Sequence, residues 1–246
     1  MGMLTDKIAL VTGASRGIGA AAARLFTEEG ATVVLTARTE SALKAIADDL
    51  PGASYVVADL GDVASIERAV ATVVERHGRL DIAFNNGAVG VPPHPVADFP
   101  EDDFDLVLRV NLKGVFYAVS AEVKAMAGNG GAIVNTSSVG SLMGNPALPA
   151  YGAAKRAVNS LTESAAVTYA KDGIRVNAIA PGLTMTEMVE DWNRHDPGVI
   201  DRIVAGTPLG RAAQPEEIAQ AAAWLLSDRA SFVTGVVLPV TGGTAV

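Results

Sequence analysis

Tyr151 and Lys155 lie four residues apart in the segment PAYGAAK (149–155), and only Gly and Ala separate them. If the segment is helical, residues four apart share one face, so the phenol and the ammonium would lie side by side. An ammonium next to a tyrosine lowers the pKa of the phenol, which would let Tyr151 transfer protons. A plain surface contact is the alternative, and the spacing alone does not separate the two interpretations.

A glycine-rich segment, TGASRGIG (12–19), follows an apolar run and begins a stretch with helical spacing. Glycines let the backbone turn tightly and approach a pyrophosphate, whose charge the free N–H groups of a helix N-terminus stabilise. A purely structural turn is the alternative. Because the segment connects the first expected strand to the first expected helix, we predict a dinucleotide site.

The end of the second apolar run should select the dinucleotide. An acid there would bind the ribose 2′-hydroxyl of NAD, whereas a basic residue would bind the 2′-phosphate of NADP. The run ends at Thr36-Ala37-Arg38, and Arg16 lies in the glycine-rich segment. Two guanidinium groups suit a phosphate dianion, so we predict NADP(H) rather than NAD(H), the alternative being two solvated arginines.

The order of apolar runs predicts the scaffold that positions these residues. Strand-like runs occur at 7–12, 32–37, 54–58, 80–84, 132–137, 174–179 and 235–240. Helical spacing occurs at 17–29, 39–49, 62–76, 102–127, 150–171 and 215–227. Continuous apolar runs are typical of parallel strands buried on both faces. We therefore predict one α/β domain over 1–246, with a doubly wound, parallel, seven-stranded sheet and helices on both faces. The stretch 183–214 breaks the alternation and predicts a lid or substrate loop.

The composition excludes several classes of function. A net charge of −8 disfavours nucleic acid and anionic membranes as partners. No apolar run is long enough to span a membrane, and the N-terminus lacks a signal-peptide pattern, so we expect a cytoplasmic protein. The chain has no cysteine and three scattered histidines, which predicts no disulfide, no thiolate chemistry and no metal site.

Several motifs together resemble one family. In chain order they are TGASRGIG, Asn85-Asn86, Asn111, a serine at the end of IVNTSS, YGAAK and Pro181-Gly182. This set is similar to the compact, single-domain branch of the short-chain dehydrogenases/reductases, including 3-oxoacyl-[acyl-carrier-protein] reductase-like enzymes. The resemblance covers essentially the whole chain. It implies a Rossmann fold and hydride transfer between a nicotinamide cofactor and a carbonyl or alcohol.

The resemblance also implies catalytic roles. Tyr151 would be the general acid or base at the substrate oxygen, and Lys155 would lower its pKa and bind the nicotinamide ribose. Ser138 would hydrogen-bond the substrate oxygen, with Ser137 as its rival. Asn111 would hold a water that connects Lys155 to solvent.

Further residues would bind the cofactor by the same resemblance. Asp59 would bind the adenine amino group, although it could instead cap the next helix, while Thr184 would contact the carboxamide and Thr186 a phosphate. The predicted cofactor residues are Gly13, Ser15, Arg16, Gly17, Ile18, Gly19, Arg38, Asp59, Leu60, Asn86, Gly87, Tyr151, Lys155, Pro181, Gly182, Thr184 and Thr186. One departure is Asn85-Asn86-Gly87-Ala88 where the family usually has NNAG; we expect slightly altered cofactor packing.

Apolar side chains in 139–150, in the loop after Asn86 and in the lid predict a small, rather apolar ketone or secondary alcohol as substrate. A fatty-acid type 3-oxoacyl-carrier-protein reductase is the alternative, disfavoured because 125–132 carries no charge to attract an acidic carrier. A non-catalytic NADP(H)-binding redox sensor is a second alternative, disfavoured by the complete Ser–Tyr–Lys–Asn set. Small residues on two long helices and the resemblance imply a homotetramer, a dimer of dimers.

Overall fold

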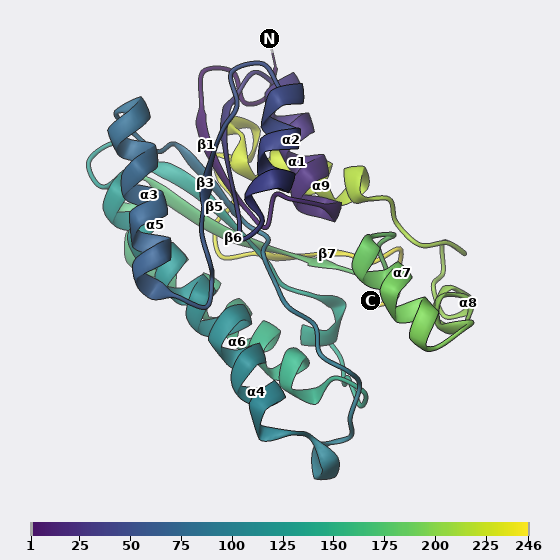
Figure 1. The fold of residues 1–246 in the computed structure, drawn as a ribbon. Coiled ribbons are helices and arrows are strands. Elements are labelled where there is room, and N and C mark those ends of the chain that lie inside the picture. Colours follow the sequence, from purple (N-terminus) through teal and green to yellow (C-terminus); the bar gives the residue numbers. More distant parts are fainter. Residues whose placement is uncertain (1, 246) are drawn as a thin grey trace.

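The computed structural model describes residues 2–245, in which seven strands form one parallel sheet (Figure 1). The strands are β1 (Ile8–Thr12), β2 (Thr32–Ala37), β3 (Ser54–Val57), β4 (Ile82–Asn85), β5 (Gly131–Thr136), β6 (Ile174–Pro181) and β7 (Val237–Val240). Their order is β3-β2-β1-β4-β5-β6-β7, so the chain reverses direction across the sheet between β1 and β4. The predicted doubly wound α/β fold is confirmed. Such a reversal is where ligands bind in open α/β sheets.

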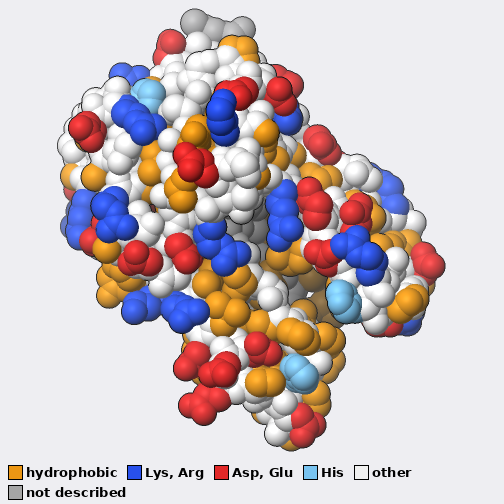
Figure 2. Space-filling view, in the orientation of Figure 1, with side chains coloured by type: hydrophobic (Ala, Val, Ile, Leu, Met, Phe, Trp, Pro, Cys, Tyr) orange, Lys and Arg blue, Asp and Glu red, His pale blue; other side chains and the backbone are white. Residues whose placement is uncertain are grey.

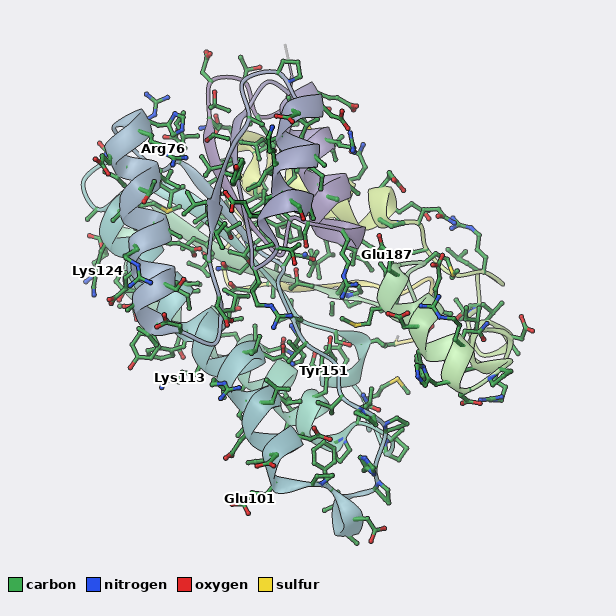
Figure 3. All side chains as sticks on the ribbon, viewed as in Figure 1. Arg76, Glu101, Lys113, Lys124, Tyr151 and Glu187 are labelled. Carbon is green, nitrogen blue, oxygen red and sulfur yellow. The ribbon has the colours of Figure 1, made fainter. Side chains whose placement is uncertain are left out.

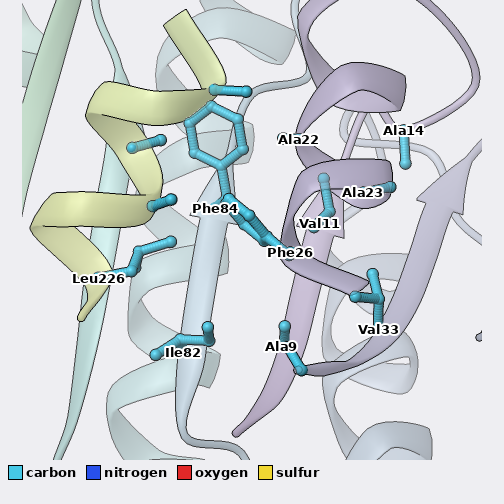
Figure 4. Close-up of a cluster of buried hydrophobic side chains, with 14 of the residues drawn as sticks. Ala9, Val11, Ala14, Ala22, Ala23, Phe26, Val33, Ile82, Phe84 and Leu226 are labelled. Atoms are coloured by element: carbon cyan, nitrogen blue, oxygen red, sulfur yellow. The ribbon is translucent and has the colours of Figure 1, made fainter. Parts of the chain in front are cut away.

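Helices cover both faces of the sheet, because each helix has one apolar side. Against one face pack α1 (Gly17–Glu28), α2 (Glu40–Asp49) and α9 (Pro215–Leu226). Against the other pack α3 (Val63–His77), α5 (Val115–Met126) and α6 (Pro149–Tyr169). The first core centres on Phe26 and Phe84, whose ring centroids are 6.0 Å apart, next to Leu226 (Figure 4). Each buried aromatic ring contributes about 2–3 kcal/mol to folding.

Parallel register places polar residues at one edge of the sheet. Thr12 at the end of β1 lies opposite Asn85 at the end of β4, and Asn85 lies opposite Asn135 of β5. The segments that follow these strand ends are the glycine-rich loop, the loop after Asn86 and the turn that contains Ser138. The fold therefore brings three motifs that are distant in the sequence to one edge.

The expected helix at 102–127 is present and contains a π-helical turn. It consists of α4 (Glu101–Leu108), a π-helical segment (Arg109–Gly114) and α5. Two tertiary contacts lie in the π segment. The side chain of Asn111 bonds to the backbone of Val89, and a Cβ on Gly114 would lie 2.4 Å from the carbonyl oxygen of Leu60. Residues 101–126 are therefore helical throughout, as expected, and only the π-helical turn, which accompanies these contacts between distant segments, was not predicted.

The stretch 183–214 lies outside the two helical layers and contains two short helices, α7 (Glu187–His195) and α8 (Val199–Ala205) (Figure 1). Its two ends are tied together. The N–H of Met185 donates to the carbonyl of Ala213, and the N–H of Ala213 donates to the carbonyl of Leu183, both at 2.9 Å. The segment therefore leaves and rejoins the domain at one place. Among residues 2–245, no helix combines the length and apolarity needed to cross a membrane.

Candidate active site

Tyr151 and Lys155 lie on the first turns of α6, where this helix packs against the end of β5. The Nζ atom of Lys155 lies 5.6 Å from the centre of the Tyr151 ring and donates a 2.7 Å hydrogen bond to the carbonyl oxygen of Thr136. Lys155 is buried, and Tyr151 is partly buried. The predicted helical pairing of the two side chains is therefore present, and it is part of the interior rather than a surface contact. Figure 3 shows Tyr151 near the centre of the view, below Glu187 at the start of α7.

The pKa values of this pair differ from the expectation. Burial raises the pKa of Tyr151 to about 12, and a hydrogen bond from Ser138 opposes that rise. Burial also lowers the pKa of Lys155 to about 8. The net shift of the Tyr151 pKa is thus upward, opposite to the expected lowering, because burial disfavours the charged phenolate. At neutral pH Tyr151 is a protonated phenol, the form that can donate a proton.

Ser138, rather than Ser137, faces Tyr151. The hydroxyl of Ser138 contacts the phenol and accepts a 3.1 Å bond from the N–H of Gly140. The hydroxyl of Ser137 points the other way and lies 2.5 Å from Oδ1 of Asn159. The structure therefore brings together the three side chains Ser138, Tyr151 and Lys155.

Asn111 is fully buried in the π-helical segment. Its Oδ1 accepts from the N–H of Val89, and its Nδ2 donates to the carbonyl of Val89, both at 2.9 Å. This bidentate bond holds the loop after Asn86 against the helix next to the site. The role of Asn111 in holding a water stays a prediction.

The glycine-rich loop has the shape of a cradle. Gly13 has φ of +65°, and a Cβ on it would lie 2.5 Å from the Cα of Gly87. A Cβ on Gly19 would lie 2.2 Å from the carbonyl oxygen of Gly13. No side chain caps the start of α1, so its first N–H groups are free to bind an anion. The loop, which includes Ser15 and Ile18, therefore fits the pyrophosphate of a dinucleotide.

The departure at Asn86-Gly87-Ala88 has a local explanation. A Cβ on Gly87 would lie 2.4 Å from Cδ1 of Leu60, so the leucine side chain occupies the space that an alanine at this site would need. Nδ2 of Asn86 lies 3.4 Å from the carbonyl oxygen of Thr12, and the hydroxyl of Thr12 accepts from the N–H groups of Asn86 and Gly87. The loop is thus fixed to the end of β1 in spite of the exchange.

The adenosine end of the expected site has two exposed arginines, Arg16 and Arg38. Neither forms an ion pair with any residue from 2 to 245. Glu40 lies close by in sequence, but its carboxylate accepts a 3.3 Å bond from the hydroxyl of Tyr55. In the space-filling view, Lys and Arg side chains border a hollow between the main body and the α7–α8 segment (Figure 2).

Asp59 is exposed and is not the cap of α3. Its Oδ1 accepts a 2.7 Å bond from the N–H of Gly61, while Asp62 caps the helix by accepting from Ala64 at 3.0 Å. The capping alternative for Asp59 is therefore wrong, and its second oxygen is free of protein partners among the described residues.

The segment that follows β6 passes close to the glycine-rich loop. Pro181 ends the strand, and the N–H of Gly182 donates to the carbonyl of Val240 at 2.9 Å. The hydroxyl of the buried Thr184 donates to the carbonyl of Gly182 at 3.1 Å. Thr186, just before α7, lies close enough that a Cβ on Gly17 would meet its Cγ2 at 3.1 Å. The start of α7 thus lies directly against the predicted phosphate loop.

One buried acid near the site escaped the sequence analysis. Glu122 on α5 is fully buried, and its Oε2 accepts a 2.9 Å bond from Nδ2 of Asn85, which also donates to Asn135 at 3.0 Å. Neither Oε1 of Glu122 nor Oδ1 of Asn85 has a partner among residues 2–245. Burial raises the pKa of Glu122 to about 7, with the Asn85 bond opposing that rise. A single charge on the apolar face of VFYAVSAEVKAM was the available signal.

Comparison with known proteins agrees with this geometry. A family model described as enoyl-(acyl carrier protein) reductase matches residues 13–245. The chain is 49% identical to the A-factor type gamma-butyrolactone 1′-reductase (1S-forming) of Streptomyces virginiae, over 98% of this chain and 96% of that protein. It is 38% identical to levodione reductase of Leifsonia aquatica, over 97% and 94%. The crystal structure of gox2181 superposes with a TM-score of 0.94 at 31% identity, covering 98% of this chain and 96% of that one. The chain therefore belongs to the short-chain dehydrogenase/reductase family, whose oxidoreductases use a nicotinamide cofactor and act on CH–OH and C=O groups.

Proposed function

We propose that the protein is an NADP(H)-dependent oxidoreductase that interconverts a small, rather apolar ketone and its secondary alcohol. The observation that carries this proposal is the meeting of Ser138, Tyr151 and Lys155 at the sheet edge that also holds the glycine-rich loop. A phenol, a hydroxyl and an ammonium at the dinucleotide edge of the sheet are the groups that carbonyl reduction requires.

In the direction of reduction, Tyr151 donates its proton to the carbonyl oxygen of the substrate. Ser138 donates a hydrogen bond to the same oxygen and stabilises the negative charge that develops there. Lys155 provides a positive charge 5.6 Å from the centre of the phenol ring. This charge stabilises the phenolate that remains after the proton has moved to the substrate. The nicotinamide ring supplies the hydride when the cofactor is bound. The bidentate bond of Asn111 to Val89 keeps the adjacent loop in place.

The preference for NADP(H) rests on Arg16 and Arg38, two exposed guanidinium groups with no carboxylate partner among residues 2–245. The closest acid along the chain, Glu40, is bonded to Tyr55. The two guanidinium groups would therefore bind a 2′-phosphate at this end of the site through their positive charge and paired N–H donors.

The substrate class rests on the side chains around Tyr151. Val91 packs in a small apolar cluster with Tyr151, and Met143 and Met188 are each more than two-fifths exposed. The N–H of His94 donates to the carbonyl of Ala147 at 2.9 Å, which joins the two loops that would form the wall of the pocket. An acyl lactone ketone is one candidate substrate, because a relative at 49% identity is a gamma-butyrolactone 1′-reductase.

We also propose a cytoplasmic homotetramer, a dimer of dimers. Large apolar side chains are exposed at two separate places. Phe116 and Val167 lie on the outer side of the α5–α6 pair, and Phe232 lies between α9 and β7. Two separate apolar surfaces would allow two different two-fold interfaces.

The test is NADPH oxidation by the pure protein with a panel of substrates. The panel contains aliphatic, aryl and cyclic ketones, a 2-acyl-γ-butyrolactone and a 3-oxoacyl thioester, and NADH is assayed in parallel. We expect turnover of a free ketone with NADPH, reduced about 100- to 10,000-fold in Tyr151→Phe while NADPH binding is retained. Turnover of the thioester alone would replace the proposal with the carrier-protein reductase. Tight NADPH binding without turnover of any substrate would favour the redox sensor.

A further inference from the structure

A chain of buried polar side chains lies behind Ser138 and is not used by the mechanism above. Ser137 and Ser141 are both about 2% exposed, and Asn159 is partly buried on α6, one turn beyond Lys155. Oγ of Ser137 lies 2.5 Å from Oδ1 of Asn159, and Nδ2 of Asn159 lies 3.0 Å from Oγ of Ser141. Oγ of Ser141 lies 2.7 Å from the carbonyl oxygen of Ser138.

Oγ of Ser137 also lies 2.9 Å from Oγ of Ser141 and 3.2 Å from the carbonyl oxygen of Lys155. With the Asn159 amide as its acceptor, the shortest of these contacts, the side-chain bonds form one sequence. Ser137 donates to Asn159, Asn159 donates to Ser141, and Ser141 donates to the carbonyl of Ser138. The bonds therefore run in one direction and end on the backbone of the residue that faces Tyr151. Asn159 is the one side chain that bonds to both serines, and networks of this kind hold their members in a defined geometry.

The turn at 138–141 has a second hydrogen bond from α6, through Arg156. Nε of Arg156 donates to the carbonyl of Ser141 at 2.8 Å, and the N–H of Ser141 donates to the carbonyl of Ser138 at 2.9 Å. Arg156 and Asn159 are three residues apart, so they occupy one side of α6. The turn has little intrinsic stiffness, since Gly140 and Gly144 lie within or just after it. Its position relative to Tyr151 therefore depends on these contacts with α6.

We propose that Asn159, acting through Ser141, is a positioning residue that sets the separation between the Ser138 hydroxyl and the Tyr151 phenol. The inference rests on the proposed carbonyl reduction, in which both hydroxyl groups must reach one substrate oxygen. Helix α6 then carries Tyr151 and Lys155 on its first turns and fixes their third partner with its next turn. Loss of the Asn159 amide releases the Ser138 turn without changing the helix that bears the phenol.

The variants are Asn159→Ala, Ser141→Ala and the double substitution, with Ser164→Ala as a matched control. Ser164 is an exposed serine of the same helix whose hydroxyl bonds only to the carbonyl of Ser160. The measurements are kcat and KM for the best ketone, the dissociation constant of NADPH from fluorescence, and amide hydrogen exchange over 137–148. Exchange needs no substrate, so it reports on the turn whether or not a ketone is reduced.

We expect both single variants to lower kcat about 10- to 100-fold, since misplacement by a fraction of an ångström to an ångström has effects of this size. NADPH binding and the KM for NADPH should stay within about twofold of the wild type. The kcat of the double variant should lie within about twofold of the kcat of the less active single variant, because both substitutions break the same network. Exchange should accelerate in 137–148 and stay unchanged in α6.

The proposal is overturned if kcat falls no further than in Ser164→Ala, or if the two losses multiply in the double variant. It is equally overturned if exchange accelerates over the whole of α6, which would indicate a general loss of stability. If the wild type reduces no ketone, the proposed function fails separately. In that case the exchange data decide the inference: acceleration confined to the turn supports it, and unchanged exchange overturns it.

Discussion

Replacing Glu122 with Gln should stabilise the protein, and the effect should depend on pH. Glu122 is fully buried between α5 and the sheet, and its Oε2 accepts from Asn85. A glutamine keeps that acceptor and adds an N–H donor. The second oxygen of Glu122, which this donor would replace, has no partner among the described residues. The substitution therefore preserves the shape of the side chain and removes the carboxyl group that titrates.

The magnitude follows from the pKa of about 7, which burial raises from the usual 4.5. The folded protein holds this proton more tightly than the unfolded chain does. The wild type is therefore stabilised by the protonated carboxyl below about pH 4.5, loses that stability as the pH rises to about 7, and changes little above it. At about 1.4 kcal/mol for each pH unit between the two pKa values, the loss is about 3 kcal/mol.

The assay is urea denaturation of both proteins between about pH 5 and pH 8 at fixed ionic strength and protein concentration. The free energy of unfolding of Glu122→Gln minus that of the wild type should increase by about 2.5 kcal/mol over this range, because the first part of the change lies below about pH 5, with unchanged m-values. Glu163→Gln, which removes an exposed carboxyl from α6, should show no comparable increase. A difference that is constant with pH, or a variant that is less stable at about pH 8, would refute the reasoning.

Four other substitutions test the cofactor site and the assembly. Arg38→Ala should weaken NADPH binding about 10- to 100-fold and change NADH binding by less than about twofold, as measured by fluorescence titration, because only NADPH carries the 2′-phosphate. Gly13→Ala should abolish NADPH binding, since its Cβ would meet backbone, whereas Gly87→Ala should cost only about 1 kcal/mol of the free energy of unfolding, since its Cβ would meet the movable end of Leu60. Phe232→Glu, a charge at a fully exposed apolar site, should convert tetramers to dimers in light scattering; a monomeric wild type would contradict the proposed assembly.

The architecture was predictable because parallel strands buried on both faces leave continuous apolar runs. Every strand was expected, and each end lies within two residues of the structure. The helix over Tyr151 and Lys155 was equally clear from its spacing. What the sequence did not predict depends on contacts between distant segments. The π-helical segment around Asn111 contains its bonds to Val89, and α7 and α8 lie in a stretch with little apolar periodicity.

Within the site, residue types and approximate neighbours were predictable, but their electrostatics were not. The pKa of Tyr151 rises because its surroundings exclude water, and no spacing in a sequence reports that exclusion. The resemblance favours Ser138 over Ser137, and the physical basis of that preference is the bond between Ser137 and Asn159, 22 residues further along the chain. Glu122 was passed over because a lone acid in a helix is ordinarily solvated.

The two backbone hydrogen bonds between 183–185 and Ala213 close the α7–α8 segment at its base, so this segment could be replaced without moving the rest of the domain. A loop whose ends already meet adds little closure entropy when its length changes, roughly 0.6 kcal/mol for each doubling. The proposed catalytic side chains all lie on α6, on the π-helical segment and in the turn after β5, outside this loop. A chimaera that takes residues 186–212 from a relative should therefore keep its proton donor and fold while it acquires the donor protein's substrate range. Diversification within this lineage then needs no change to the chemistry, only a different loop between the same two hydrogen bonds.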